Sequence, residues 1–305
     1  NDVIDGRGDV SDQVRYDRPT GATVNLSTGV AIDGFGGTDT ISGIERIRAS
    51  SHDDVLTGDA NDNRFTPQAG ADTIDGGAGI DTVSYDTTFN EPNVGVTVNL
   101  TTGLATDAGG STDTLTSIEN IVGTDFNDTI TGSSDANSLS GQDGVDTFIG
   151  SAGNDILRGS SNTEDFSTNY SVVDYSSGTL GLTVTGSSSS ATATSGVFGT
   201  DTLFNIDAVI GGSGDDNFSA TSLEFEGLGG NDTFTNVQRV RYDNSTSGVT
   251  VSLATGIAFD GFGGTDSLAG DGLDISGSAF NDIITGSGTN TTIENLRGGA
   301  GNDVI

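Results

Sequence analysis

The sequence predicts an all-β solenoid built from short parallel strands. A nine-residue pattern recurs along much of the chain, and each copy places an apolar residue two positions after an acidic residue or an asparagine. Glycine is abundant, with 48 of 305 residues. No apolar period of 3.6 residues persists, so helices are not expected over most of the chain. A fixed short period is typical of repeat architectures in which each coil packs on its neighbours.

The nine-residue pattern is G-G-x-G-x-D-x-U-x, in which U is apolar. Residues 76–84 and 211–219 match it at every fixed position, residues 298–305 match it as far as they run, and residues 150–158 lack one glycine. Copies with fewer glycines keep the spacing in two ladders, which contain Glu45, Asp54, Asn63, Asp72 and Asp81, and then Glu119, Asp128, Asn137, Asp146 and Asp155. Each x-U-x triplet is expected to form a very short strand whose apolar side chain faces the interior.

A longer unit surrounds these ladders. Each copy opens at a tyrosine and continues with an alternating strand, a Thr-Gly turn, a glycine-rich acidic turn and an Ile-Glu step, and the third copy is degraded. We expect one continuous solenoid over residues 1–305, with sub-repeats at approximately 16–84, 85–174, 175–241 and 242–305. Overlaying Asn302 on Asn1 is consistent with one unit of a tandem array, and equally with frequent recurrence of Asn-Asp-x-Ile.

The charge of the chain indicates that the chain either stays expanded or is neutralised by a positive partner. Ten arginines stand against 44 acidic residues, which gives a net charge of −34. Self-repulsion on this scale opposes a compact state. Nucleic acid is excluded as a partner because its phosphates would add to the repulsion. Cysteine is absent, and no run of about 18 apolar residues could span a membrane. Divalent cations are the expected partners, since carboxylates and backbone carbonyls are ligands suited to calcium.

The spacing of the repeat explains how it could bind calcium. Glycines at positions one, two and four permit positive φ and a tight turn that points carbonyl oxygens inward, and the aspartate at position six adds a carboxylate. Two nine-residue steps make one coil, so turns 18 residues apart stack on the same side. An ion between two such turns can collect six to eight oxygens. We therefore expect several calcium ions as the cofactor.

The stacked pairs follow from this geometry. They are Asp54 with Asp72, Asn63 with Asp81, Asp128 with Asp146, and Asn137 with Asp155. Asp216 and Asp303 are also expected to bind metal, although the register around Asp216 and Asp232 is irregular. The complete set of expected metal-site residues is Asp54, Asn63, Asp72, Gly76, Gly77, Gly79, Asp81, Asp128, Asn137, Asp146, Gly153, Asp155, Gly211, Gly212, Gly214, Asp216, Asp232, Gly298, Gly299, Gly301 and Asp303.

The nonapeptide array resembles the repeats-in-toxin (RTX) family, also called haemolysin-type calcium-binding repeats. The resemblance implies a right-handed parallel β-roll with calcium in the turns, type I secretion, and folding on calcium outside a bacterial cell. The longer units are similar to inserts in large members of that family. Many turns here lack glycines, so the resemblance implies metal at a minority of positions.

The favoured function is structural or adhesive: a filament, a surface layer or an adhesin stalk that meets copies of itself or neighbouring repeats end to end. Cell-surface polysaccharide is a further candidate partner. The alternative is a calcium-dependent secretion module attached to an enzyme outside this fragment. We expect no enzymatic activity in the chain itself, because the single histidine, His52, falls in a turn without an evident catalytic partner.

Overall fold

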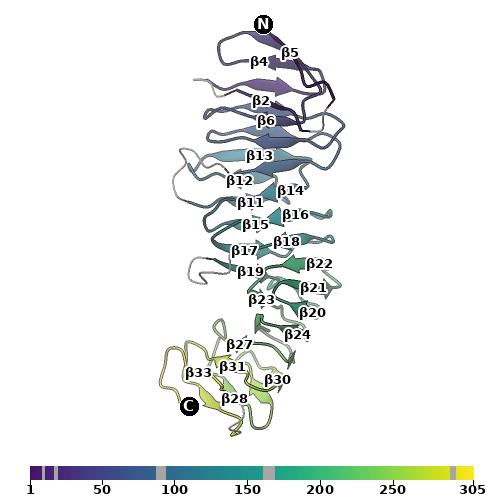
Figure 1. Cartoon of the computed structure of the whole chain (residues 1–305). Coiled ribbons are helices and arrows are strands. Elements are labelled where there is room, and N and C mark those ends of the chain that lie inside the picture. Colours follow the sequence, from purple (N-terminus) through teal and green to yellow (C-terminus); the bar gives the residue numbers. More distant parts are fainter. Residues whose placement is uncertain (9–10, 17–19, 87–93, 161–168, 289–292) are drawn as a thin grey trace. The chain divides into compact units, whose positions relative to one another are not determined.

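The computed structural model describes residues 1–8, 11–16, 20–86, 94–160, 169–288 and 293–305 (Figure 1). Throughout these ranges the regular structure consists of β-strands of two to six residues, and no helix is present. These ranges accordingly contain no helix that is long and apolar enough to cross a membrane. The chain is therefore all-β, as the sequence predicts.

The chain divides into two compact units, and each is described by itself. Unit 1 comprises Asn1–Thr147 and Ser160–Asn169, and unit 2 comprises Phe148–Gly159 and Tyr170–Ile305. Strand β17 (Val145–Ile149) lies across the division. The single solenoid over residues 1–305, its four sub-repeats and its place in a tandem array stay predictions.

Unit 1 contains two sheets of stacked short strands. In hydrogen-bonded order the first contains β1 (Val3–Asp5), β5 (Thr38–Ser42), β4 (Val30–Ile32), β3 (Thr23–Asn25), β7 (Val55–Thr57), β9 (Thr73–Asp75), β13 (Thr112–Thr116), β12 (Leu104–Thr106), β11 (Thr97–Asn99) and β15 (Thr129–Thr131). The second contains β2 (Gln13–Arg15), β6 (Arg46–Arg48), β8 (Arg64–Thr66), β10 (Thr82–Ser84), β14 (Asn120–Val122) and β16 (Ser138–Ser140). Successive coils pair in parallel, as expected for a β-roll.

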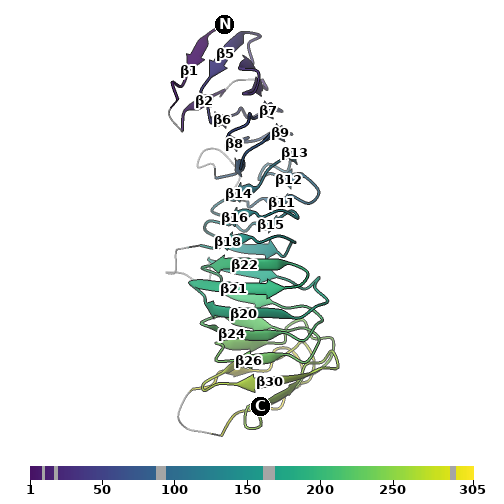
Figure 2. The same ribbon diagram turned by 90° about the vertical axis from the view of Figure 1, so that its right-hand side faces the viewer.

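Unit 2 repeats this arrangement (Figure 2). Its first sheet is parallel and contains β19 (Tyr170–Asp174), β23 (Ala208–Ile210), β25 (Glu224–Glu226), β27 (Arg239–Arg241), β31 (Asp274–Ser276) and β33 (Leu296–Arg297). Its second contains β18 (Ile156–Arg158), β22 (Gly199–Phe204), β21 (Ser190–Ser195), β20 (Leu182–Ser187), β24 (Asn217–Thr221), β26 (Thr233–Thr235), β30 (Thr265–Ala269), β29 (Ile257–Phe259), β28 (Thr250–Ser252) and β32 (Ile283–Thr285).

Four antiparallel meanders interrupt the parallel rolls, and the sequence analysis did not predict them. They are β3–β5, β11–β13, β20–β22 and β28–β30, one for each long repeat. In three of them the glycine of the Thr-Gly turn has a left-handed backbone, with φ of 68° at Gly29, 67° at Gly103 and 68° at Gly256. Such a turn reverses the chain within a few residues, so a strand expected to continue the coil folds back beside itself.

The interior of each unit is a narrow stack of single apolar side chains. Alternation along a three-residue strand directs only its middle residue inward. Ile47, Phe65 and Val83 in unit 1 are fully buried, as the nine-residue pattern predicts. In unit 2 the ring of Phe218 stacks on Phe225 and Phe234, with centroid distances of 4.6 and 5.2 Å. Because each strand buries so little apolar surface, the turns between strands carry much of the structural specificity.

Candidate metal sites in the turns

The structure brings three of the four predicted pairs together. The backbone N–H of the first member donates to Oδ1 of the second over 2.7 Å for Asp54 and Asp72, 2.7 Å for Asn63 and Asp81, and 3.1 Å for Asp128 and Asp146. Residues 18 apart therefore stack one coil above the other. The fourth pair, Asn137 with Asp155, is divided between the two units and stays a prediction.

Unit 2 contains two stacks whose spacing differs from 18 residues. Asp216 donates its N–H to Oδ1 of Asp232 over 2.8 Å, and Asp282 donates to Asp303 over 3.0 Å. The first spacing is only 16 because β24 and β25 are joined by a tight turn in which Ser222 has a φ of 62°. Asp282 was not among the predicted residues, although Asn281-Asp282-Ile283-Ile284 resembles the end of other copies.

In one kind of turn a backbone N–H of the turn caps the side chain at position six, and we call it a capped turn. The N–H at position two donates to Oδ2 of the aspartate, over 2.9 Å from Ser50 to Asp54 and 2.7 Å from Thr124 to Asp128. The equivalent Oδ1 atoms accept N–H groups from a neighbouring meander. Capped turns end at Asp54, Asn63, Asp128, Asn137, Asp216 and Asp282, with an amide oxygen as the acceptor in the two asparagines.

The other kind of turn leaves one carboxylate oxygen without a donor, and we call it an open turn. Open turns end at Asp72, Asp81, Asp146 and Asp232, whose Oδ2 atoms are buried and have no hydrogen-bond partner. Position two is left-handed in all four, with φ of 72° at Gln68, 96° at Gly77, 69° at Gln142 and 66° at Leu228. This conformation turns the N–H away from the carboxylate, so the oxygen stays free to bind a cation.

Glycines serve two different purposes in these turns. At position four of the open turns, φ lies between 123° and 128° at Gly70, Gly79, Gly144 and Gly230. At position one, φ is not positive, contrary to the prediction. Glycine is required at Gly76 and Gly227, where a side-chain carbon would lie 2.6 Å from Asp81 Oδ2 and 1.9 Å from Asp232 Oδ2, respectively. The first glycine therefore makes space for the carboxylate.

The most complete motif of unit 2 is a capped turn. Gly212 donates its N–H to Asp216 Oδ2 over 3.0 Å, and neither Gly212 nor Gly214 is left-handed. A side chain does not fit at Gly212 or Gly214 because the backbone atoms of Gly178 and Leu180 pack directly against these two glycines. The match of residues 211–216 to the repeat pattern therefore does not by itself predict an open turn. Gly211, at position one, makes space for Asp216 Oδ2, as the first glycine does in the open turns.

The two remaining predicted turns differ from each other. At the C-terminal motif Gly299 and Gly301 are left-handed, as in an open turn, and Gly298 lies against Asp303 Oδ2. At the other motif Gly153 is left-handed, but the Ser151 hydroxyl donates to Asp155 Oδ2 over 2.9 Å. A hydroxyl thus occupies the place that is free in the open turns.

The carboxylates of the open turns have strongly raised pKa values. Burial is the main cause, and it raises the pKa of Asp72 to about 9, those of Asp146 and Asp232 to about 8, and that of Asp81 to about 6. Neighbouring acidic side chains raise these values further, in part against the lowering effect of the backbone hydrogen bonds. A buried charge without a partner is unfavourable, and a proton or a cation can neutralise it.

The open turns fit calcium, provided that backbone carbonyls complete the ligand set. A buried unpaired carboxylate oxygen in a glycine-lined turn offers the hard oxygen that calcium prefers. In the parts of the chain that the structure describes, no three acidic or histidine side chains form a cluster that could hold a metal. Side chains alone would therefore be insufficient. Metal binding by the predicted residues stays a prediction.

The meanders close their own carboxylates with a tyrosine, which the sequence analysis missed. The phenol donates to Oδ2 of the aspartate over 2.9 Å from Tyr85 to Asp113, and over 2.7 Å from Tyr175 to Asp201. A third pair, in β28–β30, repeats this contact. Meanwhile Oδ1 of Asp113 accepts the N–H of Asp72 and so extends the stack. Recurrence of a tyrosine with a Thr-Asp step in each long repeat was the available signal.

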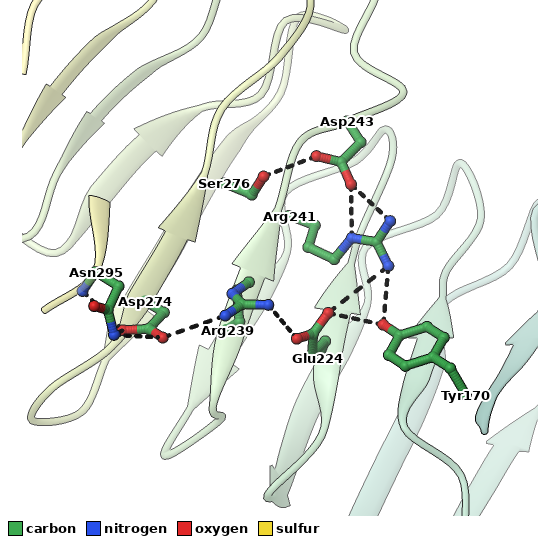
Figure 3. Close-up of polar contacts among 8 residues, drawn as sticks. All are labelled: Tyr170, Glu224, Arg239, Arg241, Asp243, Asp274, Ser276 and Asn295. Carbon is green, nitrogen blue, oxygen red and sulfur yellow. Dashed lines mark hydrogen bonds and ion pairs between the residues drawn. The ribbon is translucent and has the colours of Figure 1, made fainter. Parts of the chain in front are cut away.

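A second group of acidic residues is neutralised by arginines. On the first sheet of unit 2, Arg239 contacts Glu224 and lies 3.5 Å from Asp274, while the Tyr170 hydroxyl donates to Glu224 over 2.8 Å (Figure 3). Arg241 adds a bond of 2.7 Å to Asp243. These residues extend across β19, β25, β27 and β31. The acidic residues of this cluster therefore have arginine partners, whereas no ion pair is found for the open-turn aspartates in the part of the chain that the structure describes.

Replacing Arg239 by alanine is expected to destabilise unit 2 by about 1–3 kcal/mol, since it removes the cation that faces Asp274 and one of the two arginines that face Glu224. Urea unfolding of the variant in saturating calcium would measure this. Arg297→Ala removes an exposed arginine from the neighbouring strand β33 and should change stability by less than about 0.5 kcal/mol. Equal effects of the two substitutions would contradict the structural role of Arg239.

Comparison with known proteins agrees with the turn geometry. The family model of the RTX calcium-binding nonapeptide repeat matches four segments, residues 42–67, 48–83, 122–159 and 288–305. These segments include the open turns at Asp72, Asp81 and Asp146 and the motif at Asp303, but not the stack of Asp216 on Asp232. No curated protein matches the chain.

Proposed function

Because this chain carries RTX calcium-binding nonapeptide repeats, we propose that it is a calcium-stabilised extracellular structural module, the repetitive part of a filament, surface layer or adhesin. Calcium ions in the open turns neutralise buried carboxylates and let the acidic coil condense. The folded roll then acts as a stiff spacer whose edge strands can accept further coils.

One observation carries this proposal: the buried and unpaired Oδ2 atoms of Asp72, Asp81, Asp146 and Asp232. Each belongs to a turn whose second residue is left-handed, so the backbone N–H that caps other turns is directed elsewhere. Leaving a buried acceptor unsatisfied costs about 1–3 kcal/mol, and more when the group is charged. Four such groups in a chain with so little apolar core favour an ion that binds only the folded state.

The net charge supports the same conclusion. At −34, the chain repels itself strongly, and every bound calcium removes two negative charges. A chain of this kind stays expanded where calcium is scarce and condenses where it is plentiful. This behaviour suits a protein that is exported unfolded and folds outside a bacterial cell.

The structural role is favoured over the rival role of a secretion module attached to an enzyme. Repetition of one coil through both units supports a scaffold. The rival role would require a catalytic domain elsewhere in the same polypeptide. The two differ in self-association, because a scaffold should assemble end to end whereas a secretion module should remain monomeric.

Calcium withdrawal tests the proposed function. In EDTA at pH 7.5 we expect the far-ultraviolet circular dichroism signal of β-structure to be lost and the hydrodynamic radius to increase. Calcium at millimolar concentrations should restore both, since extracellular modules commonly bind with dissociation constants of about 10⁻⁴–10⁻³ M. Magnesium, which dehydrates reluctantly, should not substitute. An unchanged β-signal and radius in EDTA would refute the proposal.

Assembly is tested on the calcium-loaded chain. Sedimentation velocity and negative-stain electron microscopy should show end-to-end oligomers or filaments if the chain is a scaffold. A strictly monomeric species that binds no bacterial surface polysaccharide would support the secretion-module alternative instead.

A further inference from the structure

Two acidic turns inside the meanders have the same unsatisfied chemistry as the open turns. Asp107 follows β12 and Asp260 follows β29, and their side chains are 5% and 0% exposed. Oδ1 of each accepts backbone N–H groups of its own turn, at 2.7 Å from Ser111 and 2.9 Å from Gly264. Oδ2 of each is buried and has no hydrogen-bond partner. Both residues lie outside the matched nonapeptide segments.

In unit 2, the free Oδ2 atom of Asp260 in the meander lies beside the open turn that ends at Asp232. Strands β26 and β30 pair in register, and the N–H of Asp232 donates to Oδ1 of Asp266 over 3.0 Å. The carbonyl oxygen of Gly230, in that open turn, and Oδ2 of Asp260 both lie within 2.5 Å of the point where a side-chain carbon on Gly264 would sit. A carbonyl of the open turn and the free oxygen of the meander turn are therefore close neighbours.

The Tyr242 phenol does not neutralise Asp232 or Asp260. Asp266 Oδ2 takes the only proton that the Tyr242 phenol can donate, over 3.1 Å. Asp232 and Asp260 each keep one buried free oxygen. Burial raises the pKa of Asp232 to about 8, against the lowering effect of the N–H of Asp216, and the carboxylates of Asp266, Asp216 and Asp260 add to the increase.

The hydrogen bonds and free oxygens of this arrangement recur in unit 1. The N–H of Asp72 donates to Asp113 Oδ1, and the Tyr85 phenol takes Asp113 Oδ2. Asp72 and Asp107 again each keep a buried free oxygen.

The third long repeat acts as an internal control. Its meander turn has Ser195 at the position of Asp107 and Asp260, six residues before Asp201. In the preceding coil, the Ser151 hydroxyl donates to Asp155 Oδ2. Where the second carboxylate is missing, the first is therefore capped by a side chain. Among the second, third and fourth long repeats, the nonapeptide turn that stacks on the meander therefore keeps a free oxygen only where the meander turn also has one.

We propose that Asp232 and Asp260 in unit 2, and Asp72 and Asp107 in unit 1, each form a divalent-cation site between an open nonapeptide turn and the meander turn next to it. The two carboxylates supply charge, and backbone carbonyls, with Gly230 as the one identified in unit 2, complete the oxygen shell. The choice of calcium as the ion rests on the proposed function. These sites extend metal binding beyond the nonapeptide motif, because the meander supplies the ligand that a following repeat would otherwise provide.

Calcium stoichiometry of the full chain tests this inference. Equilibrium dialysis against calcium should show that Asp107→Asn with Asp260→Asn binds two fewer ions per chain than the wild type. Asp33→Asn alters the equivalent, less buried turn of the first repeat and should bind as many ions as the wild type. An unchanged stoichiometry in the double variant would overturn the proposal, and would indicate that a proton neutralises these carboxylates instead.

A gain of binding provides a second test that does not depend on the stability of that variant. Ser151→Ala with Ser195→Asp uncaps Asp155 and adds the missing carboxylate to the third repeat, so it should bind one ion more than the wild type. No gain would count against the proposal. If the wild type itself bound no calcium, the proposed function would fail. If the wild type bound calcium and both double variants bound the same number of ions as the wild type, only this inference would be overturned.

Discussion

Replacing Gly79 by alanine is expected to lower the free energy of unfolding by about 2–4 kcal/mol, a large effect for the addition of one methyl group. Gly79 has a φ of 128°, which residues with side chains rarely adopt. The added carbon would also lie 2.7 Å from the carbonyl oxygen of Asn61 in the coil below. Backbone atoms of a stacked coil cannot move aside cheaply. Urea unfolding in saturating calcium would measure the loss.

Gly36→Ala separates the effect of the left-handed backbone from the effect of close contact with a stacked coil. Gly36 is also left-handed, with a φ of 83°, but no atom lies within 4 Å of the added carbon. Only the conformational cost of about 1 kcal/mol should remain. If both substitutions were equally harmful, close stacking of one turn on another would not explain the requirement for glycine.

Without calcium, the folded state is expected to become less stable as the pH rises from about 4 to about 9. Burial raises the pKa of Asp72 from 3.8 to about 9, and those of Asp146 and Asp232 to about 8. Between these limits the folded chain binds more protons than the unfolded chain, so stability is greatest at low pH and is lost as the pH rises. In EDTA, the β-signal should therefore be stronger at pH 5 than at pH 8.5.

Calcium should reverse this dependence, because it binds the deprotonated carboxylates and its affinity increases with pH. Thermal unfolding at several pH values, with and without calcium, would measure both trends. A variant that combines Asp72→Asn, Asp146→Asn and Asp232→Asn should lose most of the pH dependence in EDTA. Persistence of the full dependence in that variant would show that other groups are responsible.

The interior and the stacking of unit 1 were predictable because both depend on local spacing. A three-residue strand with one apolar residue has only one way to face the interior, so Phe65 and Val83 are buried as expected. A coil of two nine-residue steps places Asp54 above Asp72 whatever lies elsewhere in the chain. In unit 2 this local rule is altered by one tight turn at Ser222, which shortens a coil by two residues.

The meanders could not be predicted with the same rule. Their alternating strands look like coil strands, and in three of the four meanders the left-handed glycine of the Thr-Gly turn reverses the chain. The closure of Asp113 by Tyr85 joins residues 28 positions apart and depends on where the reversed strands place both side chains.

By itself, the sequence determined the all-β class, the nine-residue period, the residues that face inward, and the stacking of residues 18 apart in unit 1. Which of these similar carboxylates keeps a free oxygen was decided only by the tertiary structure. Asp54 and Asp72 occupy the same place in the repeat, yet Ser50 caps one while the left-handed backbone at Gln68 leaves the other open. The difference depends on the coils above and below each turn, because a buried oxygen is satisfied by whichever donors the neighbouring layers direct toward it.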